Sequence, residues 1–210
     1  LLDTASPYHP VYLTRIDGHS AWINQIAAGK ARLFNQVKPN KGGDIINNCI
    51  LIDRTMDIVE NILPEPNEND IEQWIRSAVD TIIKRGITGV HDAWQCPKTV
   101  SVLKKMARSG ELAIRCYGML GNSYPELLDE FFSNNHLHLG NYTVRSVKVF
   151  IDGALGSRGA ALLDPYSDDP SNSGLILIEK NKFEKLAIRC RDAGFQLNTH
   201  AIGDRGNKIV

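Results

Sequence analysis

From residue 69 to residue 200 the sequence alternates between helix-like and strand-like segments, and this alternation limits the possible folds more than any other feature. Apolar residues that recur every three or four positions predict helices, and short unbroken apolar runs predict buried strands. The predicted helices cover residues 69–86, 98–108, 124–132 and 181–193, and the predicted strands cover residues 87–92, 112–119, 144–151 and 195–200. Strict alternation of this kind is typical of a parallel sheet with helices outside.

We therefore predict the α/β class, with a partial (β/α)8 TIM barrel over residues 69–210. Four parallel strands are about half of an eight-stranded barrel, and a full barrel takes about 250 residues. Asn69 can cap the first helix, with Glu72 three residues on, and Gly86 can end it. Residues 1–68 keep no helical period for long, so we expect an irregular excursion that packs over one end of the barrel.

The chain begins with Leu1 rather than Met, and residues 205–210 resemble the start of a helix, so we expect a piece of a longer protein. The 24 basic and 24 acidic residues cancel, and no basic stripe favours nucleic acid or an anionic membrane. No apolar run approaches the roughly 20 residues of a membrane span. The four cysteines lie far apart and predict free thiols in a reducing compartment, the cytoplasm.

Lys148 stands out because it lies inside an apolar strand, in the run V-K-V-F-I-D-G over residues 147–153. An unpaired buried ammonium costs several kcal/mol, so this lysine must be paired, neutralised by a lower pKa or chemically modified. If the neighbouring valines face the helices, the period of two places Lys148, Phe150 and Asp152 on the barrel interior. An ion pair with Asp152 or another acidic neighbour inside the barrel is one alternative at this point, and a functional role is the other.

His200 ends the last predicted strand, in the string L-N-T-H-A-I-G-D over residues 197–204. Barrel enzymes keep their chemistry at the carboxyl ends of strands, which makes His200 a candidate metal ligand. A hydrogen-bonded histidine at a strand end is the alternative.

Four strings then resemble one known family: D-G-H-S-A-W-I-N at 17–24, G-I-T-G-V-H-D-A at 86–93, V-K-V-F-I-D-G-A-L-G-S-R at 147–158 and T-H-A-I-G-D at 199–204. In this order they resemble amidohydrolase family 3, in the YtcJ-like branch that includes the N-substituted formamide deformylases. The resemblance spans nearly the whole chain. It implies a metal-dependent hydrolase on a distorted TIM barrel, usually with zinc or a similar divalent ion.

In that superfamily the metal is held by a His-x-His pair on the first strand, a carboxylated lysine or acidic residue on the fourth, histidines on the fifth and sixth, and an Asp on the eighth. By resemblance, Lys148 falls on the fourth-strand position and His200 on the fifth. A carbamate on Lys148 would replace a buried cation with an anionic oxygen ligand able to bridge two metal ions. The implied reaction is hydrolysis of a small-molecule, non-peptide amide-type C–N bond by metal-activated water.

The eighth-strand Asp that would move the proton is absent, so no catalytic residue is assigned. Asp204 does not replace it, because it follows Gly203 where a helix N-cap is expected. His136 and His138 have His-x-His spacing but precede the fourth-position strand, which indicates a surface coincidence. Because two ligands fall short of the three or four of a catalytic zinc, we expect this chain alone to be inactive and to bind metal weakly.

Five further residues are predicted to contact substrate or shape its pocket. Arg158 either clamps a substrate carboxylate or carbonyl or fixes a surface loop. Asp152 orients Lys148 or the following loop, and His91 sits at the end of the first predicted strand. His19 and Trp22 lie in the excursion and cover the site.

Two other functions remain open. Lys148 could form a Schiff base with a carbonyl substrate, as in a lysine-dependent aldolase. A non-catalytic half-barrel is the third interpretation, and its open sheet edges would favour a homo-oligomer.

Overall fold

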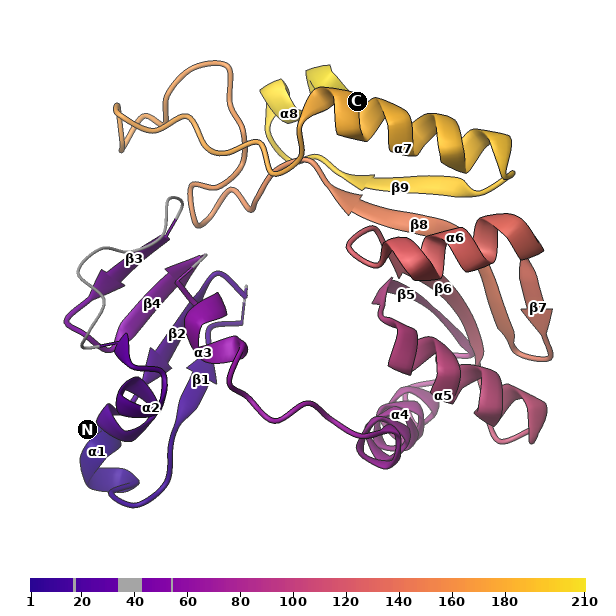
Figure 1. Cartoon of the computed structure of the whole chain (residues 1–210), viewed down its shortest axis with the longest axis horizontal. Helices are drawn as coiled ribbons and strands as arrows, with labels where there is room; N and C mark the ends of the chain where they lie inside the picture. The colour runs from indigo at the N-terminus through magenta and orange to yellow at the C-terminus, as the bar shows by residue number, and fades with distance from the viewer. Residues whose placement is uncertain (17, 34–42, 54) are drawn as a thin grey trace. The chain divides into compact units, whose positions relative to one another are not determined.

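The computed structural model describes residues 1–16, 18–33, 43–53 and 55–210, so Asp17 of the first family-like string lies outside the described residues. The chain divides into two compact units, Leu1–Glu65 and Pro66–Val210, which are coloured in sequence order in Figure 1. Each unit has its own hydrophobic core. None of the helices in the described residues is both long and apolar enough to cross a membrane.

The first unit contains an antiparallel sheet in the order β1-β2-β4-β3, built from short elements; the sequence predicted a few short strands or helices here but not their pairing. Its strands are β1 (Tyr12–Thr14), β2 (Ser20–Ile23), β3 (Gly43–Ile46) and β4 (Ile50–Asp53), with the short helices α1 (Leu2–Ala5), α2 (Gln25–Lys30) and α3 (Asp57–Glu60). Ile23, Leu51 and Val59 lie in its core. Strands of three or four residues are too short for a period to show in the sequence.

The second unit contains parallel strands in the order β5-β6-β8-β9, which makes it an α/β unit. These strands are β5 (Gly89–Gln95), β6 (Arg115–Gly121), β8 (Tyr142–Phe150) and β9 (Gln196–His200). The helices are α4 (Glu68–Ile83), α5 (Pro97–Arg108), α6 (Pro125–Asn134), α7 (Lys180–Asp192) and α8 (Asp204–Ile209). In Figure 1, α5, α6 and α7 lie along one side of this sheet.

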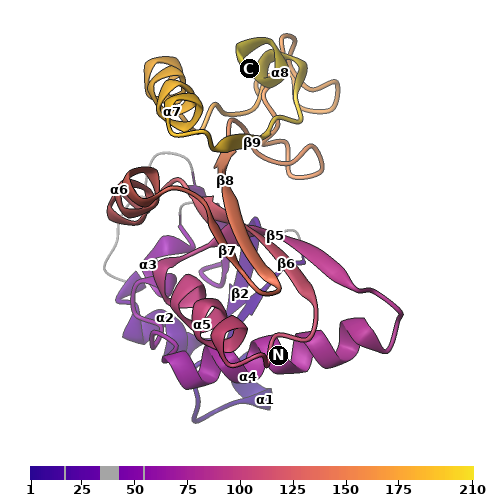
Figure 2. The ribbon, with the colours of Figure 1, turned by 90° about the vertical axis from the view of Figure 1, so that its right-hand side faces the viewer.

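A short strand, β7 (Leu137–Leu139), was not predicted. It pairs antiparallel with residues 142–144 of β8, beside which it runs in Figure 2. Farther along the same edge of β8, residues 146–150 pair with β9. The hairpin therefore leaves the carboxyl half of β8 free to pair with β9 in parallel.

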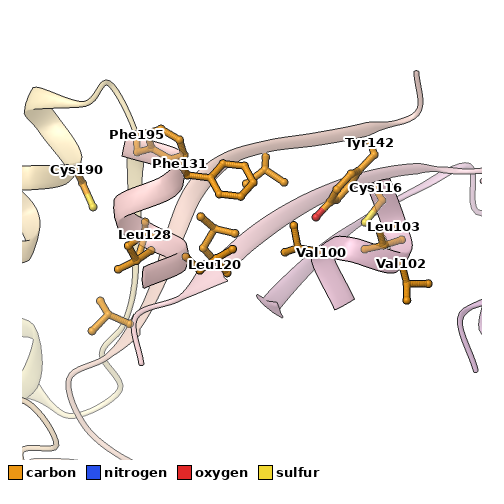
Figure 3. Close-up of a cluster of buried hydrophobic side chains, with 14 of the residues drawn as sticks. Val100, Val102, Leu103, Cys116, Leu120, Leu128, Phe131, Tyr142, Cys190 and Phe195 are labelled. Carbon is orange, nitrogen blue, oxygen red and sulfur yellow. The ribbon is translucent and has the colours of Figure 1, made fainter. Parts of the chain in front are cut away.

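The core of the second unit joins one face of the sheet to the helices (Figure 3). Leu103 of α5, Leu120 of β6 and Leu128 of α6 are almost completely buried. Cys116 and Cys190 are free thiols within this core, and burial raises the pKa of Cys116 to about 12 and that of Cys190 to about 11. Because the thiolate is the reactive form, these two cysteines are inert packing residues at neutral pH.

Helix α4 begins two residues earlier than the sequence indicated, and its cap is Asn67 rather than Asn69. The Asn67 side chain accepts hydrogen bonds from the backbone N–H groups of Asn69 and Asp70, at 2.9 and 3.1 Å. The Asp70 carboxylate in turn accepts from the backbone N–H of Asn67 at 3.1 Å. Both Asn67-x-x-Asp70 and Asn69-x-x-Glu72 have capping-box spacing, so sequence alone does not separate them.

Substitutions of Asn67 and Asn69 distinguish which of the two residues caps α4. We expect Asn67→Ala to lower the free energy of unfolding by about 1 kcal/mol, because two N–H groups of the first turn lose their acceptor. Asn69→Ala is the matched control, since alanine at an exposed helical position is neutral or slightly stabilising. Urea denaturation followed by circular dichroism measures both changes. Equal destabilisation by the two variants would contradict this assignment of the cap.

Candidate metal centre

Lys148 and His200 project from adjacent parallel strands on the same face of the sheet. Val147 and Val149 are at most 1% exposed in the helix-facing core, so Lys148 and Phe150 point to the opposite face. In the parallel register, Lys148 pairs with Asn198 and Phe150 pairs with His200. The face opposite the helices therefore carries an amine, an amide and an imidazole at neighbouring strand ends.

The Lys148 ammonium has no carboxylate partner among the described residues. Its Nζ lies 4.6 Å from the centroid of the Phe150 ring, a cation–π contact. Partial burial lowers the pKa of Lys148 below its usual value, and no neighbouring anion opposes that shift. The ion pair with Asp152, one of the two alternatives open from the sequence, is not formed. Lys148 therefore loses its proton more easily than a surface lysine does.

One ring nitrogen of His200, Nε2, has a hydrogen-bonding partner in the protein. Its Nε2 lies 3.3 Å from the carbonyl oxygen of Gly153 and 3.8 Å from Oδ1 of Asp152. Because a carbonyl oxygen only accepts, Nε2 carries the proton in this hydrogen bond. In the neutral ring the lone pair is then on Nδ1, which is the nitrogen able to bind a metal.

Two aromatic rings, those of Trp94 and Phe150, lie beside Lys148 and His200. Their ring centroids are 5.4 Å apart, and Phe150 also lies 5.0 Å from the His200 ring. Trp94 is 37% exposed and Phe150 is 36% exposed, so each still presents a face to solvent. Gly121 of β6 makes room for the indole, because a Cβ at that position would lie 2.8 Å from Cε2 of Trp94.

Trp94 was missed by sequence reasoning because the predicted strand stopped at Asp92. The strand β5 continues to Gln95, so Trp94, rather than His91, occupies its carboxyl end. His91 instead stacks on Tyr117 with the ring centroids 4.9 Å apart. The available signal was the aromatic residue directly after Ala93, since aromatic residues favour strands.

Asn198 leaves a polar atom without a partner. Its side-chain Nδ2 is inaccessible to solvent and makes no hydrogen bond within the described part of the chain. A buried donor of this kind costs about 1–3 kcal/mol unless a ligand accepts from it. Among the described residues, no three His, Cys, Asp or Glu side chains are grouped as a metal site. The amine and the imidazole are groups that could hold a metal ion, and the unused amide donor could hydrogen-bond to an anionic group beside them.

The other predicted contact residues differ in their exposure to solvent. Arg158 is exposed and forms a two-pronged ion pair with Asp168, at 3.1 and 2.7 Å, which lowers the pKa of that carboxylate. His19 and Trp22 belong to the first unit, where Trp22 is 39% exposed on β2. Asp152 is completely buried after the end of β8.

Two further histidines and Asp204 have structural partners. His136 contacts the carbonyl oxygen of Gly194 at 2.8 Å, and His138 contacts the Thr143 hydroxyl at 2.9 Å. Asp204 is the first residue of α8 rather than its N-cap, which is Gly203. Its carboxylate accepts from the backbone N–H groups of Leu163 and Arg205, both at 2.8 Å.

Comparison with known proteins finds a matching family profile, similar sequences and similar structures. The sequence profile of the Amidohydrolase family matches residues 1–207. The putative amidohydrolase YtcJ of Bacillus subtilis is 27% identical over 97% of this chain and 40% of its own length. Protein LONG AFTER FAR-RED 3 of Arabidopsis thaliana is also 27% identical, over 100% of this chain and 39% of its own. The chain thus spans about 40% of the length of these relatives.

Two crystal structures have a similar fold, both of uncharacterized metal-dependent hydrolases. The protein from Pyrococcus horikoshii gives a TM-score of 0.74 at 27% identity, over 95% of this chain and 41% of that one. The protein from Pyrococcus furiosus gives 0.73 at 27% identity, over 96% of this chain and 42% of that one. The similarity therefore extends over both units of this chain.

The position of Trp94 depends on Gly121, which yields a direct prediction. We expect Gly121→Ala to displace the indole and to destabilise the chain by about 1–3 kcal/mol, because the added methyl group overpacks the site. Tryptophan fluorescence and near-ultraviolet circular dichroism report the displacement. Gly156→Ala is the matched control, because a Cβ at that position meets nothing within 4 Å. Wild-type spectra for Gly121→Ala would show that Trp94 does not occupy this position.

Proposed function

The chain belongs to the amidohydrolase family, and we propose that it carries part of the metal centre of a hydrolase for non-peptide carbon–nitrogen bonds. The observation that carries the proposal is that Lys148 and His200 lie on adjacent parallel strands and share the face of the sheet opposite the helix-facing core. The similarity to the two Pyrococcus metal-dependent hydrolases supports a divalent metal ion as the cofactor, and we propose that this ion is zinc.

We propose that the second unit is about half of a (β/α)8 TIM barrel, assigned to residues 69–210. The parallel order β5-β6-β8-β9 and the helices on one face support this architecture. The opposite face, which carries Lys148 and His200, would then line the interior of the barrel.

Lys148 is proposed to be carboxylated. The lowered pKa increases the fraction of neutral amine, and the neutral amine attacks the carbon of carbon dioxide. An N–C bond forms and one proton leaves, so an anionic carbamate replaces the amine. Asn198, its register partner on β9, offers the unused Nδ2 donor to a carbamate oxygen. This pairing would satisfy both the buried amide and the new anion.

The carbamate oxygens of Lys148 and Nδ1 of His200 would hold the metal. When bound, such an ion activates water for attack and polarises the carbonyl group of the substrate. The remaining ligands and the carboxylate that passes the proton to the leaving amine would come from outside residues 1–210. Two ligands bind zinc weakly, so the 210-residue chain alone is proposed to be inactive.

The substrate is proposed to be a small amide-type molecule in the cytoplasm, with neither nucleic acid nor a membrane as partner. Trp94 and Phe150 would exclude water from one side of it. Contacts from His91, His19 and Trp22 remain predictions. Arg158 would have to exchange Asp168 for a substrate carboxylate, since its guanidinium already holds that residue. A homo-oligomer is also proposed for the 210-residue chain by itself, because β5 and β9 each pair along one edge only within the described residues.

A lysine-dependent aldolase is the second candidate, and the lowered pKa of Lys148 favours it too. In that mechanism the neutral amine attacks a substrate carbonyl carbon and water leaves as the C=N bond forms. Borohydride reduction would then trap substrate on Lys148. The amidohydrolase proposal predicts no trapping and an activity that requires both bicarbonate and metal.

Two ligand variants test the hydrolase proposal. In the full-length protein we expect Lys148→Met and His200→Ala each to weaken zinc binding by about 100-fold or more, because each removes a direct ligand. Zinc content after gel filtration and competition with a chromophoric chelator measure the loss. Lys185→Met is the matched control, because Lys185 is exposed on α7. Unchanged zinc affinity in either ligand variant would refute the site.

A further inference from the structure

Asp152 is a carboxylate buried at the end of β8, with 0% of its surface exposed. It accepts hydrogen bonds from the backbone N–H groups of Ala161 at 2.9 Å, Ile202 at 2.9 Å and Gly203 at 2.8 Å. Among the described residues, the nearest side chain able to carry a positive charge is His200, whose Nε2 lies 3.8 Å from Oδ1. Backbone amides, rather than a lysine or an arginine, therefore compensate this buried charge.

The three donors come from two separate loops. Ala161 belongs to the loop that follows β8, whereas Ile202 and Gly203 belong to the turn between β9 and α8. The loops meet so closely that a Cβ on Gly203 would overlap the carbonyl group of Ala161, and one on Gly206 would lie 2.7 Å from Oδ2 of Asp152. The Gly206 N–H also donates to the Ala161 carbonyl oxygen at 3.2 Å. The carboxylate is thus the common acceptor that joins the two loops.

These loops continue directly from the strands that carry Lys148 and His200. The Gly153 carbonyl oxygen, next to Asp152, accepts a hydrogen bond from Nε2–H of His200. The His200 carbonyl oxygen accepts one from the N–H of Ile151 at 2.9 Å. Oδ1 of Asp152 faces the same edge of the imidazole at 3.8 Å. A negative charge beside Nε2 favours the tautomer with the proton on that nitrogen, which leaves Nδ1 free.

We propose that Asp152 is a positioning residue that fixes both loops and the tautomer of His200, and so presents Nδ1 to the metal. It does not itself contact metal or substrate, because its oxygens are occupied and completely buried. This inference rests on the proposed metal site. It adds a residue whose loss would weaken metal binding through His200.

The experiment compares Asp152→Asn with Asp204→Asn in the full-length protein. The amide of the first variant removes the charge and directs an N–H group at backbone donors. We expect its zinc dissociation constant to rise by about 10–100-fold, as for other residues that orient a metal-binding histidine. Asp204 also links the loop after β8 to α8, but it is exposed, so its variant should bind zinc within about 2-fold of the wild type.

A lower melting temperature of metal-free Asp152→Asn with zinc affinity within 2-fold of the wild type would overturn the proposal, because the role would then be structural only. If that variant does not fold, the ring 15N shifts of His200 in the metal-free wild type decide the question. They should report a proton on Nε2, and a proton on Nδ1 would overturn the proposal. Absence of zinc binding by the wild type would instead refute the hydrolase function and leave the tautomer measurement valid.

Discussion

The packing of β8 against the helices determines which face of the sheet carries Lys148 and, through the register with β9, the other residues proposed to hold the metal. Val147, Val149 and Ile151 are at most 1% exposed, and each contributes about 1.5–3 kcal/mol by its burial. A shift of the strand by one residue would expose all three and drive the Lys148 amine among the helices. The hydrophobic core therefore directs this lysine to the opposite face, whatever its chemistry.

The orientation of β8 also fixes the orientation of the side chains on the neighbouring strand β9. Because β8 and β9 are parallel, residues paired in their register share a face, which places Asn198 beside Lys148 and His200 beside Phe150. The chain leaves both strands at the same edge of the sheet, and Asp152 ties the two loops there. Core packing, parallel register and one buried carboxylate thus act in sequence to bring an amine and an imidazole to a common site.

The sequence predicts what depends on periodicity and misses what depends on contacts. The apolar period of α5 and α7 and the β-rich runs of β6, β8 and β9 are local, so these elements were predicted close to their observed bounds. The strand β7 is three residues long, and β5 reaches Gln95 only across a register shift, where Gln95 pairs with Leu120 of β6. The burial of Asp152 depends on loops 9 and 50 residues away along the chain. The apolar pattern within one segment does not indicate which other segments that segment contacts.

The central claim is that Lys148 and His200 bind the same metal ion, and anomalous diffraction from crystals of the full-length protein grown with zinc and bicarbonate tests it most directly. The account predicts an anomalous peak at the zinc edge about 2.0–2.2 Å from both Nδ1 of His200 and a carbamate oxygen on Lys148. An unmodified Lys148 still lying over the Phe150 ring, with the zinc bound elsewhere, would contradict it.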